Sequence, residues 1–287
     1  MVELLVSFLF DEISFFNLFS YLSTRTILST LTSLLLVLIF GEGFIRLISS
    51  FQFNQTFDGR APERHMVKHG TPTMGGILIV SSVLISGILW GNLFDKYLIL
   101  GLICIVGFAI IGFIDDYKKV KTESSKGLSS IEKIFFQSIL AGIISISLFM
   151  LAVDKNELIY IVPFFKNVAL DLGIFFIFIS IFIIVGSSNA VNLTDGLDGL
   201  AILPVIIITS ALGIIAWAAG NVIASDYLYI PYVEGTGELL VLCGALIGAG
   251  IGFLWFNTYP AQIFMGDVGS LSMGAFIAYI ACLLYTS

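Results

Sequence analysis

The chain has 287 residues, of which 58% are hydrophobic and 11% are charged, and its mean hydropathy is +1.04. A soluble domain is about half apolar and about a quarter charged, so this composition excludes an ordinary soluble protein and indicates an integral membrane protein. The net charge of −7 and the lack of a basic patch argue against nucleic-acid binding.

Apolar runs predict the fold, because a helix needs about 20 apolar residues to cross a bilayer. The stretch 4–20 is interrupted by Asp11, Glu12 and Asn17, and we predict an interfacial helix there. The rest predicts an all-α, polytopic transmembrane helix bundle in a single domain covering residues 1–287. Eight spans are expected, at roughly 24–48, 72–92, 97–114, 132–153, 170–188, 199–219, 238–256 and 268–286.

Basic residues predict the orientation of these spans. Nine of the thirteen lie at the ends of the first and third spans: Arg46, Arg60, Arg64, Lys68, Lys118, Lys119, Lys121, Lys126 and Lys133. The positive-inside rule therefore places these loops in the cytoplasm and the N-terminus outside. The loops after spans one, three, five and seven then share one face, and they contain the polar sequences around Lys68, Asp115, Asp195 and Asp267.

The string HGTPTMGG covers residues 69–76, directly before the second predicted span. Its Gly and Thr residues would expose backbone N–H groups and hydroxyls at a helix N-terminus, which is a ready anion site. Lys68 adds a cation beside it. A turn followed by a helix cap would explain the same string.

Two adjacent aspartates, Asp115 and Asp116, follow the apolar run GFAIIGFI. Neighbouring residues on a helix point about 100° apart, so one carboxylate can face a metal or nucleophile while the other faces a basic group. Repulsion between two carboxylates this close also favours a proton on one of them, which suits a proton acceptor. A solvated helix end before a lysine-rich loop is the alternative. Lys133, after the turn KGLSS, opens the fourth span or snorkels to the interface.

The string NAVNLTDGLDGLA covers residues 189–201. Asp195 and Asp198 are three residues apart and would share one face of a helix. Gly196 and Gly199 permit close backbone approach. Asn192 adds a neutral oxygen ligand of the kind that hard cations accept. An ordinary loop is the alternative.

The string WFNTYPAQIFMGDVGS covers residues 255–270. Asn257 can pair with the edge of a base, and Phe264 can stack on a ring. Asp267 follows Gly266 at the start of a helix, where a carboxylate can act as a cap. A cap and a metal ligand are not exclusive roles. Farther back, Gly244, Gly248 and Gly252 repeat every four residues, which is typical of close helix packing in membranes.

The strings GTPTMGG, DDYKK with a following KGL, NAVNLTDGLDGLA and FNTYPAQIFMGDVGS resemble the phospho-N-acetylmuramoyl-pentapeptide-transferase family, within the polyprenyl-phosphate sugar-1-phosphate transferases. The resemblance runs from about residue 40 to the end. It implies Mg²⁺-dependent transfer of phospho-MurNAc-pentapeptide from UDP-MurNAc-pentapeptide to undecaprenyl phosphate, giving lipid I and UMP in peptidoglycan synthesis. It also implies a homodimer in the bacterial cytoplasmic membrane, with the active site facing the cytoplasm.

The resemblance also implies roles for individual residues. Asp115 and Asp116 match an aspartate pair that activates or positions the lipid phosphate. Asp267 matches an aspartate linked to Mg²⁺, and Asn192 is a neighbouring candidate ligand. Substrate-binding residues are expected at Lys68, Thr73, Lys133, Asp195, Gly196, Leu197, Asp198, Asn257 and Phe264, with the uridine region at positions 196–198, 257 and 264.

Some alternatives stay open at this point. The family has ten spans and a late histidine-rich loop, so with eight spans we expect the chain to be shortened at its C-terminus, and we assign activity to the intact parent protein. Attack by the lipid phosphate can be direct, with Asp115 as the base, which we favour, or can pass through an aspartyl-phosphate. A related enzyme for another UDP-linked amino sugar, a transporter and an inactive fragment are the alternative functions.

Overall fold

The computed structural model describes residues 14–50, 71–122, 127–152, 159–161 and 169–285. Its main elements are eight helices: α2 (Leu22–Ser50), α4 (Gly76–Trp90), α5 (Lys96–Lys121), α6 (Ser130–Leu151), α7 (Phe175–Thr194), α8 (Ile202–Ala219), α10 (Leu239–Asn257) and α11 (Gly266–Tyr285). Within the described ranges, seven helices are long and apolar enough to cross a membrane, and α4, with 15 residues, is shorter. The predicted polytopic helical bundle is therefore confirmed, although the second predicted span is shorter than expected.

Smaller elements lie between and before these helices. They are the 3₁₀ helices η1 (Ser14–Ser20) and η3 (Thr236–Glu238), the short helix α9 (Val222–Leu228), and strands β1 (Ile159–Ile161) and β2 (Ala169–Asp171), which pair antiparallel. This two-stranded ribbon is an addition to the predicted all-α fold. The predicted interfacial helix at 4–20 is described only from residue 14, where the backbone is the 3₁₀ helix η1; its first part lies outside the described residues.

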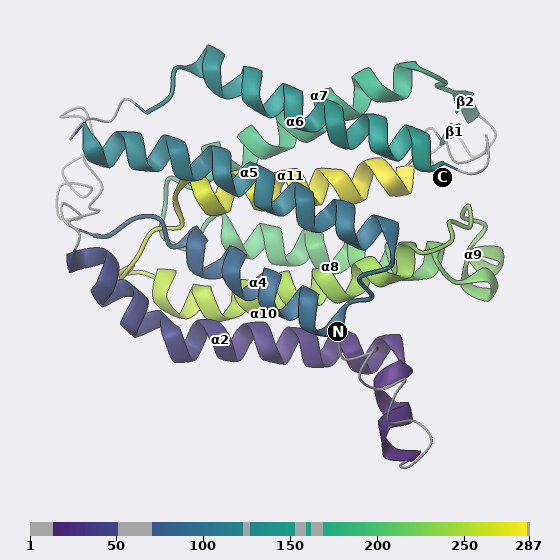
Figure 1. The fold of residues 1–287 in the computed structure, drawn as a ribbon, viewed down its shortest axis with the longest axis horizontal. Helices are drawn as coiled ribbons and strands as arrows, with labels where there is room; N and C mark the ends of the chain where they lie inside the picture. The colour runs from purple at the N-terminus through teal and green to yellow at the C-terminus, as the bar shows by residue number, and fades with distance from the viewer. Residues whose placement is uncertain (1–13, 51–70, 123–126, 153–158, 162–168, 286–287) are drawn as a thin grey trace.

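The helices run back and forth along one axis (Figure 1). The last turns of α2, α5, α7 and α10 lie at one end, on the left in Figure 1, together with the first turns of α4, α6, α8 and α11. We call this the motif end, and the opposite end the far end. The predicted alternation of the spans is thus observed, and it brings the polar motifs to one end of the bundle.

Helix α11 lies inside the bundle, against α5, α7, α8 and α4. Of its apolar window 89% is buried, compared with 22% for α2 and for α7, which lie at the periphery. The glycine repeat of α10 faces α2, where a Cβ on Gly248 would collide with the backbone oxygen of Thr30. The prediction of close small-residue packing is therefore confirmed, and the site-bearing start of α11 is held from several sides.

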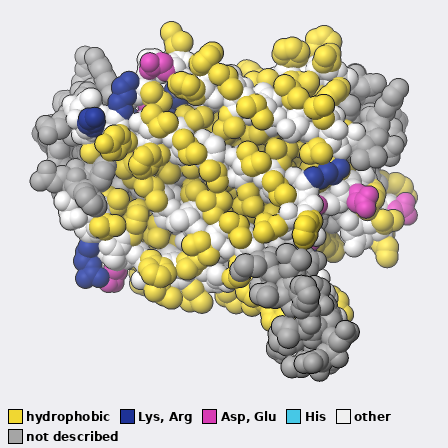
Figure 2. Space-filling view, in the orientation of Figure 1, with side chains coloured by type: hydrophobic (Ala, Val, Ile, Leu, Met, Phe, Trp, Pro, Cys, Tyr) yellow, Lys and Arg dark blue, Asp and Glu magenta, His cyan; other side chains and the backbone are white. Residues whose placement is uncertain are grey.

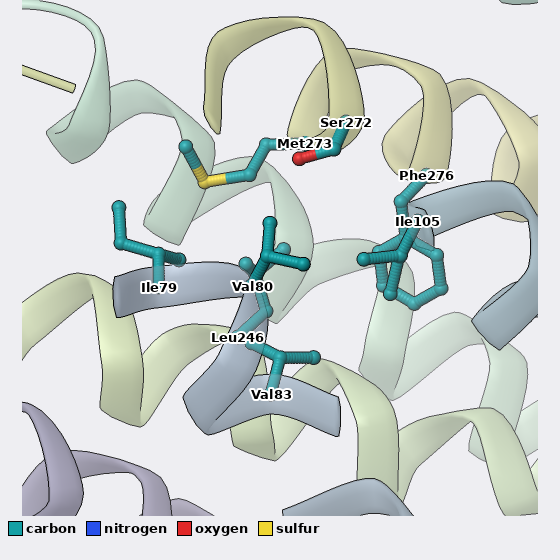
Figure 3. Close-up of a pocket in the computed structure, with 8 residues that line it drawn as sticks. All are labelled: Ile79, Val80, Val83, Ile105, Leu246, Ser272, Met273 and Phe276. Carbon is teal, nitrogen blue, oxygen red and sulfur yellow. The ribbon is translucent and has the colours of Figure 1, made fainter. Parts of the chain in front are cut away.

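The outer surface fits a lipid environment. Hydrophobic side chains cover the middle of the face in Figure 2, and the charged side chains gather toward the two ends. Inside, a small apolar cavity separates α4, α5, α10 and α11 (Figure 3), lined by Ile79, Val80, Val83, Ile105, Leu246, Ser272, Met273 and Phe276. The one hydroxyl in this lining, on Ser272, donates to the Gly269 carbonyl at 3.0 Å, and the exposed surface of the cavity is apolar.

Candidate active site

Asp115 and Asp116 lie within α5, which continues to Lys121 instead of ending near residue 114. Their exposed fractions are 2% and 3%, so the alternative of a solvated helix end is wrong. Burial follows from the approach of α11, whose first turn packs against α5. Gly112, one turn before the pair, permits this approach, because a Cβ there would collide with the backbone of Asp267.

Asp267 is the second residue of α11 and is 8% exposed. It completes a buried group of three carboxylates with Asp115 and Asp116. One oxygen from each of the three lies within 4.8 Å of the others. Carboxylate oxygens are the ligands that Mg²⁺ prefers, so this group could bind a divalent metal.

Backbone N–H groups hold one oxygen on each aspartate of the α5 pair. Asp115 Oδ1 accepts a hydrogen bond from the Leu128 N–H at 2.6 Å, in the turn before α6. Asp116 Oδ2 accepts one from the Val268 N–H at 3.2 Å. Asp116 therefore caps the N-terminus of α11 from a neighbouring helix, and the cap expected at Asp267 is supplied by Asp116.

A side-chain amide holds the outer oxygen of Asp267. With its amide oriented to suit its neighbours, the Asn192 nitrogen donates to Asp267 Oδ1 at 3.0 Å, and the Asn192 oxygen accepts from Lys133 Nζ at 3.1 Å. The same amide lies 2.8 Å from the Ser270 hydroxyl. The structure thus places Asn192, the last-turn residue of α7, beside Asp267.

Two lysines contact the three carboxylates within the described part of the chain. Lys119 Nζ lies 2.6 Å from Asp115 Oδ2, 3.2 Å from Asp267 Oδ2 and 3.4 Å from Asp116 Oδ1. Lys133 forms an ion pair with Asp267 and lies 3.7 Å from Asp115 Oδ2. Sequence reasoning did not select Lys119, although its position four residues after Asp115 is a signal that could have found it.

Lys133 reaches the carboxylates because α6 starts at a defined point. Ser129 caps this helix, and Glu132 returns a hydrogen bond to the Ser129 backbone in a capping box. The Lys133 side chain is only 14% exposed. The alternative of a lysine snorkelling to the interface is therefore wrong for Lys133.

The N-terminus of α4 is closed by the segment before α11. The Gly75 N–H donates to the Phe264 carbonyl at 2.8 Å and the Gly76 N–H to the Met265 carbonyl at 2.7 Å, while the Phe264 N–H donates to the Pro72 carbonyl at 2.9 Å. The prediction of an anion site is wrong for these two glycine N–H groups, because carbonyl oxygens already occupy them. The same pairing explains why α4 begins late.

Residues 98–285 match the family model described as glycosyl transferase family 4. Residues 68–80 match the first signature of the phospho-N-acetylmuramoyl-pentapeptide-transferases. The chain belongs to glycosyl transferase family 4. It is a phospho-sugar transferase of the phospho-N-acetylmuramoyl-pentapeptide-transferase type, and membership implies a sugar-nucleotide donor and a polyprenyl phosphate acceptor.

Two further predicted residues of this transferase lie beside the carboxylates. Asp195, at the end of α7, accepts a hydrogen bond from the Gly266 N–H. Desolvation raises the pKa of Asp195 well above its usual value, and the charges of Asp267 and Asp116 raise that pKa further. Thr73 is 8% exposed and packs against Gly266. Its hydroxyl would lie 3.0 Å from a Cβ added to that glycine.

The other predicted substrate-binding residues lie where two loops meet. Residues 195–201 form a turn between α7 and α8, so the segment is not helical and Asp195 and Asp198 do not share a helix face. Asn257 Oδ1 accepts from the Gly199 N–H at 3.0 Å, and Asn257 Nδ2 donates to the Ile263 carbonyl at 2.9 Å. Asn257 is buried, and in this structure its amide joins the two loops.

The side chains around this junction differ in how far they are exposed to solvent. Asp198 Oδ2 accepts from the Ala261 N–H at 3.3 Å, and the Phe264 side chain is 7% exposed. Gly196 and Leu197 are exposed, and Leu197 presents 49% of its surface. These positions are the most exposed part of the predicted uridine region. Lys68, the remaining predicted residue, lies outside the described residues.

Proposed function

We propose that this transferase moves phospho-MurNAc-pentapeptide from UDP-MurNAc-pentapeptide to undecaprenyl phosphate, forming lipid I and releasing UMP, with Mg²⁺. The observation that carries the proposal is the meeting of Asp115, Asp116 and Asp267 with Lys119 and Lys133 at the motif end. The matched signature at residues 68–80 supports the muramoyl substrate. The proposal places the motif end at the cytoplasmic surface of a bacterial inner membrane.

The charges of the site fit this pair of substrates. A diphosphate and a lipid phosphate are both anions, and beside three carboxylates they need compensating cations. The three carboxylate groups are a hard-oxygen donor set that suits Mg²⁺, and Asp115, Asp116 and Asp267 would hold the ion, with Asn192 beside it. Bound there, Mg²⁺ supplies positive charge to phosphate oxygens and to the leaving group.

The chemical step is one displacement at phosphorus. An oxygen of the lipid phosphate forms a bond to the β-phosphorus of the sugar diphosphate. The bond between that phosphorus and the bridging oxygen breaks, and its electron pair leaves with UMP. When the lipid phosphate arrives protonated, the Asp115 carboxylate accepts its proton.

The remaining side chains position the reacting groups. Asp116 holds the first turn of α11, and therefore Asp267, against α5. Lys133 contributes positive charge from α6. The exposed turn at Gly196 and Leu197 is the expected contact for the uridine of the donor. The lipid phosphate would reach the site from the surrounding bilayer.

UMP release tests the proposal. Purified protein in detergent is incubated with Mg²⁺, undecaprenyl phosphate and either UDP-MurNAc-pentapeptide or UDP-GlcNAc, and UMP and lipid-linked sugar are measured. We expect product with the muramoyl donor only, none without the lipid, and none after chelation of the metal. Asp267→Asn serves as the inactive control. Product from UDP-GlcNAc alone would identify the related enzyme, and no UMP from either donor would contradict the proposed function.

A further inference from the structure

Each carboxylate of the site has one outer and one inner oxygen. The outer oxygens are held by groups that carry no charge: the backbone N–H groups of Leu128 and Val268 and the amide of Asn192. The inner oxygens are Asp115 Oδ2, Asp116 Oδ1 and Asp267 Oδ2. All three lie within 3.4 Å of the Lys119 ammonium nitrogen. The fixed outer contacts thus aim the three inner oxygens at one point, and Lys119 occupies that point.

An ammonium group and a divalent cation cannot share these three oxygens. A metal bound to carboxylates lies about 2.0–2.6 Å from their oxygens. The Lys119 ammonium would then be a few ångströms from the metal, and like charges at that distance repel strongly even at an intermediate dielectric constant. Metal binding and the observed position of Lys119 therefore exclude each other.

Lys119 is the cation of the site that is free to withdraw. It lies in the last turn of α5 and its side chain is 32% exposed, whereas the Lys133 side chain is 14% exposed and also contacts Asn192. A lysine carries its charge on a flexible four-carbon stem, so the ammonium can swing into solvent without moving the helix. The three carboxylates have no such freedom, because their outer oxygens are bound.

We propose that Lys119 is an internal counter-ion that occupies the metal position and must withdraw before a divalent cation binds. Its ammonium offsets repulsion among Asp115, Asp116 and Asp267 when no metal is present, and it weakens metal affinity by competing for the same oxygens. This inference rests on the proposed function only for the presence of a metal at the three carboxylates. It makes Lys119 a determinant of metal affinity.

Metal binding without substrates tests this role. Free Mn²⁺ is measured by electron paramagnetic resonance during titration of purified protein in detergent. Lys119→Met removes the competing charge, and we expect it to bind Mn²⁺ at least about tenfold more tightly than the wild type. Lys119→Arg keeps a cation and should stay near the wild-type affinity. Misfolding would separate the three carboxylates, so it should weaken Mn²⁺ binding and not tighten it.

Lys118→Met is the matched control. Lys118 precedes Lys119 on the same helix, its side chain is 46% exposed, and it lies 3.9 Å from Glu132, away from the carboxylates. The affinity of Lys118→Met for Mn²⁺ should equal that of the wild type. Unchanged or weaker Mn²⁺ binding by Lys119→Met would overturn the inference and leave the proposed transfer reaction untouched. If Lys119→Met binds Mn²⁺ more tightly but the wild type releases no UMP, the counter-ion role stands and the proposed transfer reaction is contradicted.

Thermal unfolding gives a second readout. Without metal, Lys119→Met leaves three buried carboxylates with less positive charge, so it should melt below Lys118→Met. Added Mn²⁺ should raise its melting temperature more than that of the control, because a ligand that binds the folded state tightly stabilises it more. An equal shift in both variants would contradict the counter-ion role.

Discussion

Both ends of the bundle bury charged side chains, but they pair them differently. At the far end, Arg25 and Glu238 form a bidentate pair with distances of 2.6 and 2.7 Å, and the Asn92 N–H also donates to Glu238. The nearby Asp95 caps α5 through the Leu98 N–H. At the motif end, three carboxylates share two ammonium groups within the described ranges, and each ammonium group contacts at least two of the carboxylates.

The ion pair at the far end has a structural role, whereas the charges at the motif end remain able to bind a further ligand. A planar guanidinium fits one carboxylate, fixes its geometry and leaves it little capacity for another ligand. Among the described residues, three carboxylates face two lysines, which leaves a formal surplus of one negative charge in the cluster. Such a surplus destabilises the free protein and favours an added cation. We therefore expect substitutions at the two ends to separate turnover from stability.

The largest effect on turnover is expected for Asp267→Asn. The change removes a charge from the proposed metal-binding group, and loss of one transition-state contact of this kind lowers kcat by about 10³-fold. It removes one partner of the Lys119 and Lys133 contacts but also relieves repulsion with Asp115 and Asp116, so the melting temperature should change little. UMP release and thermal unfolding measure the two effects. A large loss of stability with normal turnover of the folded fraction would contradict the comparison.

Asp116→Asn should lower turnover by about 10²-fold, because an amide can still accept from the Val268 N–H but no longer contributes charge. Asp116→Ala removes the cap as well, and we expect a further loss of about 1 kcal/mol in the free energy of unfolding. Thermal unfolding of the two variants isolates the cap. Equal stability of the two would show that Asp116 does not hold α11.

A smaller effect is expected at Gly127, which lies against Asp115. A Cβ there would collide with the Asp115 carboxylate and displace it from the Leu128 N–H. We predict about tenfold lower turnover for Gly127→Ala, because a shift of the Asp115 carboxylate by less than about 1 Å is expected to have an effect of this order. Gly186→Ala is the control, since a Cβ at Gly186 in α7 meets no atom within 4 Å. Equal turnover of both variants would argue against a fixed position for Asp115.

The smallest effect on turnover is expected at the far end. Arg25→Met leaves Glu238 buried without its cation, which should lower the free energy of unfolding by about 3 kcal/mol. Arg25→Met with Glu238→Leu should recover most of this loss, because the pair is replaced as a unit. Turnover of the folded protein should stay within about twofold of the wild type. A marked loss of turnover in the stable double variant would show that the far end affects the chemistry.

The sequence was sufficient to predict the bundle and the meeting of its motifs. Long apolar runs set the spans, and their alternation placed Asp115, Asn192, Lys133 and Asp267 at one end. The resemblance to a known family selected the same side chains for chemical roles. Those predictions depend on local composition and on order along the chain, both of which a sequence shows directly.

Contacts between distant segments were harder to predict. The spacing of four residues from Asp115 favours Lys119 among the lysines after Asp116, but its contact with Asp267 depends on the packing of α11. The pairing of Arg25 with Glu238 joins residues 213 positions apart, and it depends on how α2 meets α10. The occupied N–H groups of Gly75 and Gly76 have the same origin, since their acceptors lie near residue 264.

The closed helix ends have a consequence for the order of binding. The N–H groups of Gly75 and Gly76 are bound to carbonyl oxygens, that of Gly266 to Asp195, and that of Val268 to Asp116. Because these four N–H groups are already engaged, cations are the expected source of attraction for a nucleotide. We therefore expect the divalent ion to bind before the donor or together with it. By reciprocity, the donor should then raise the affinity for the ion by the same factor that the ion raises the affinity for the donor.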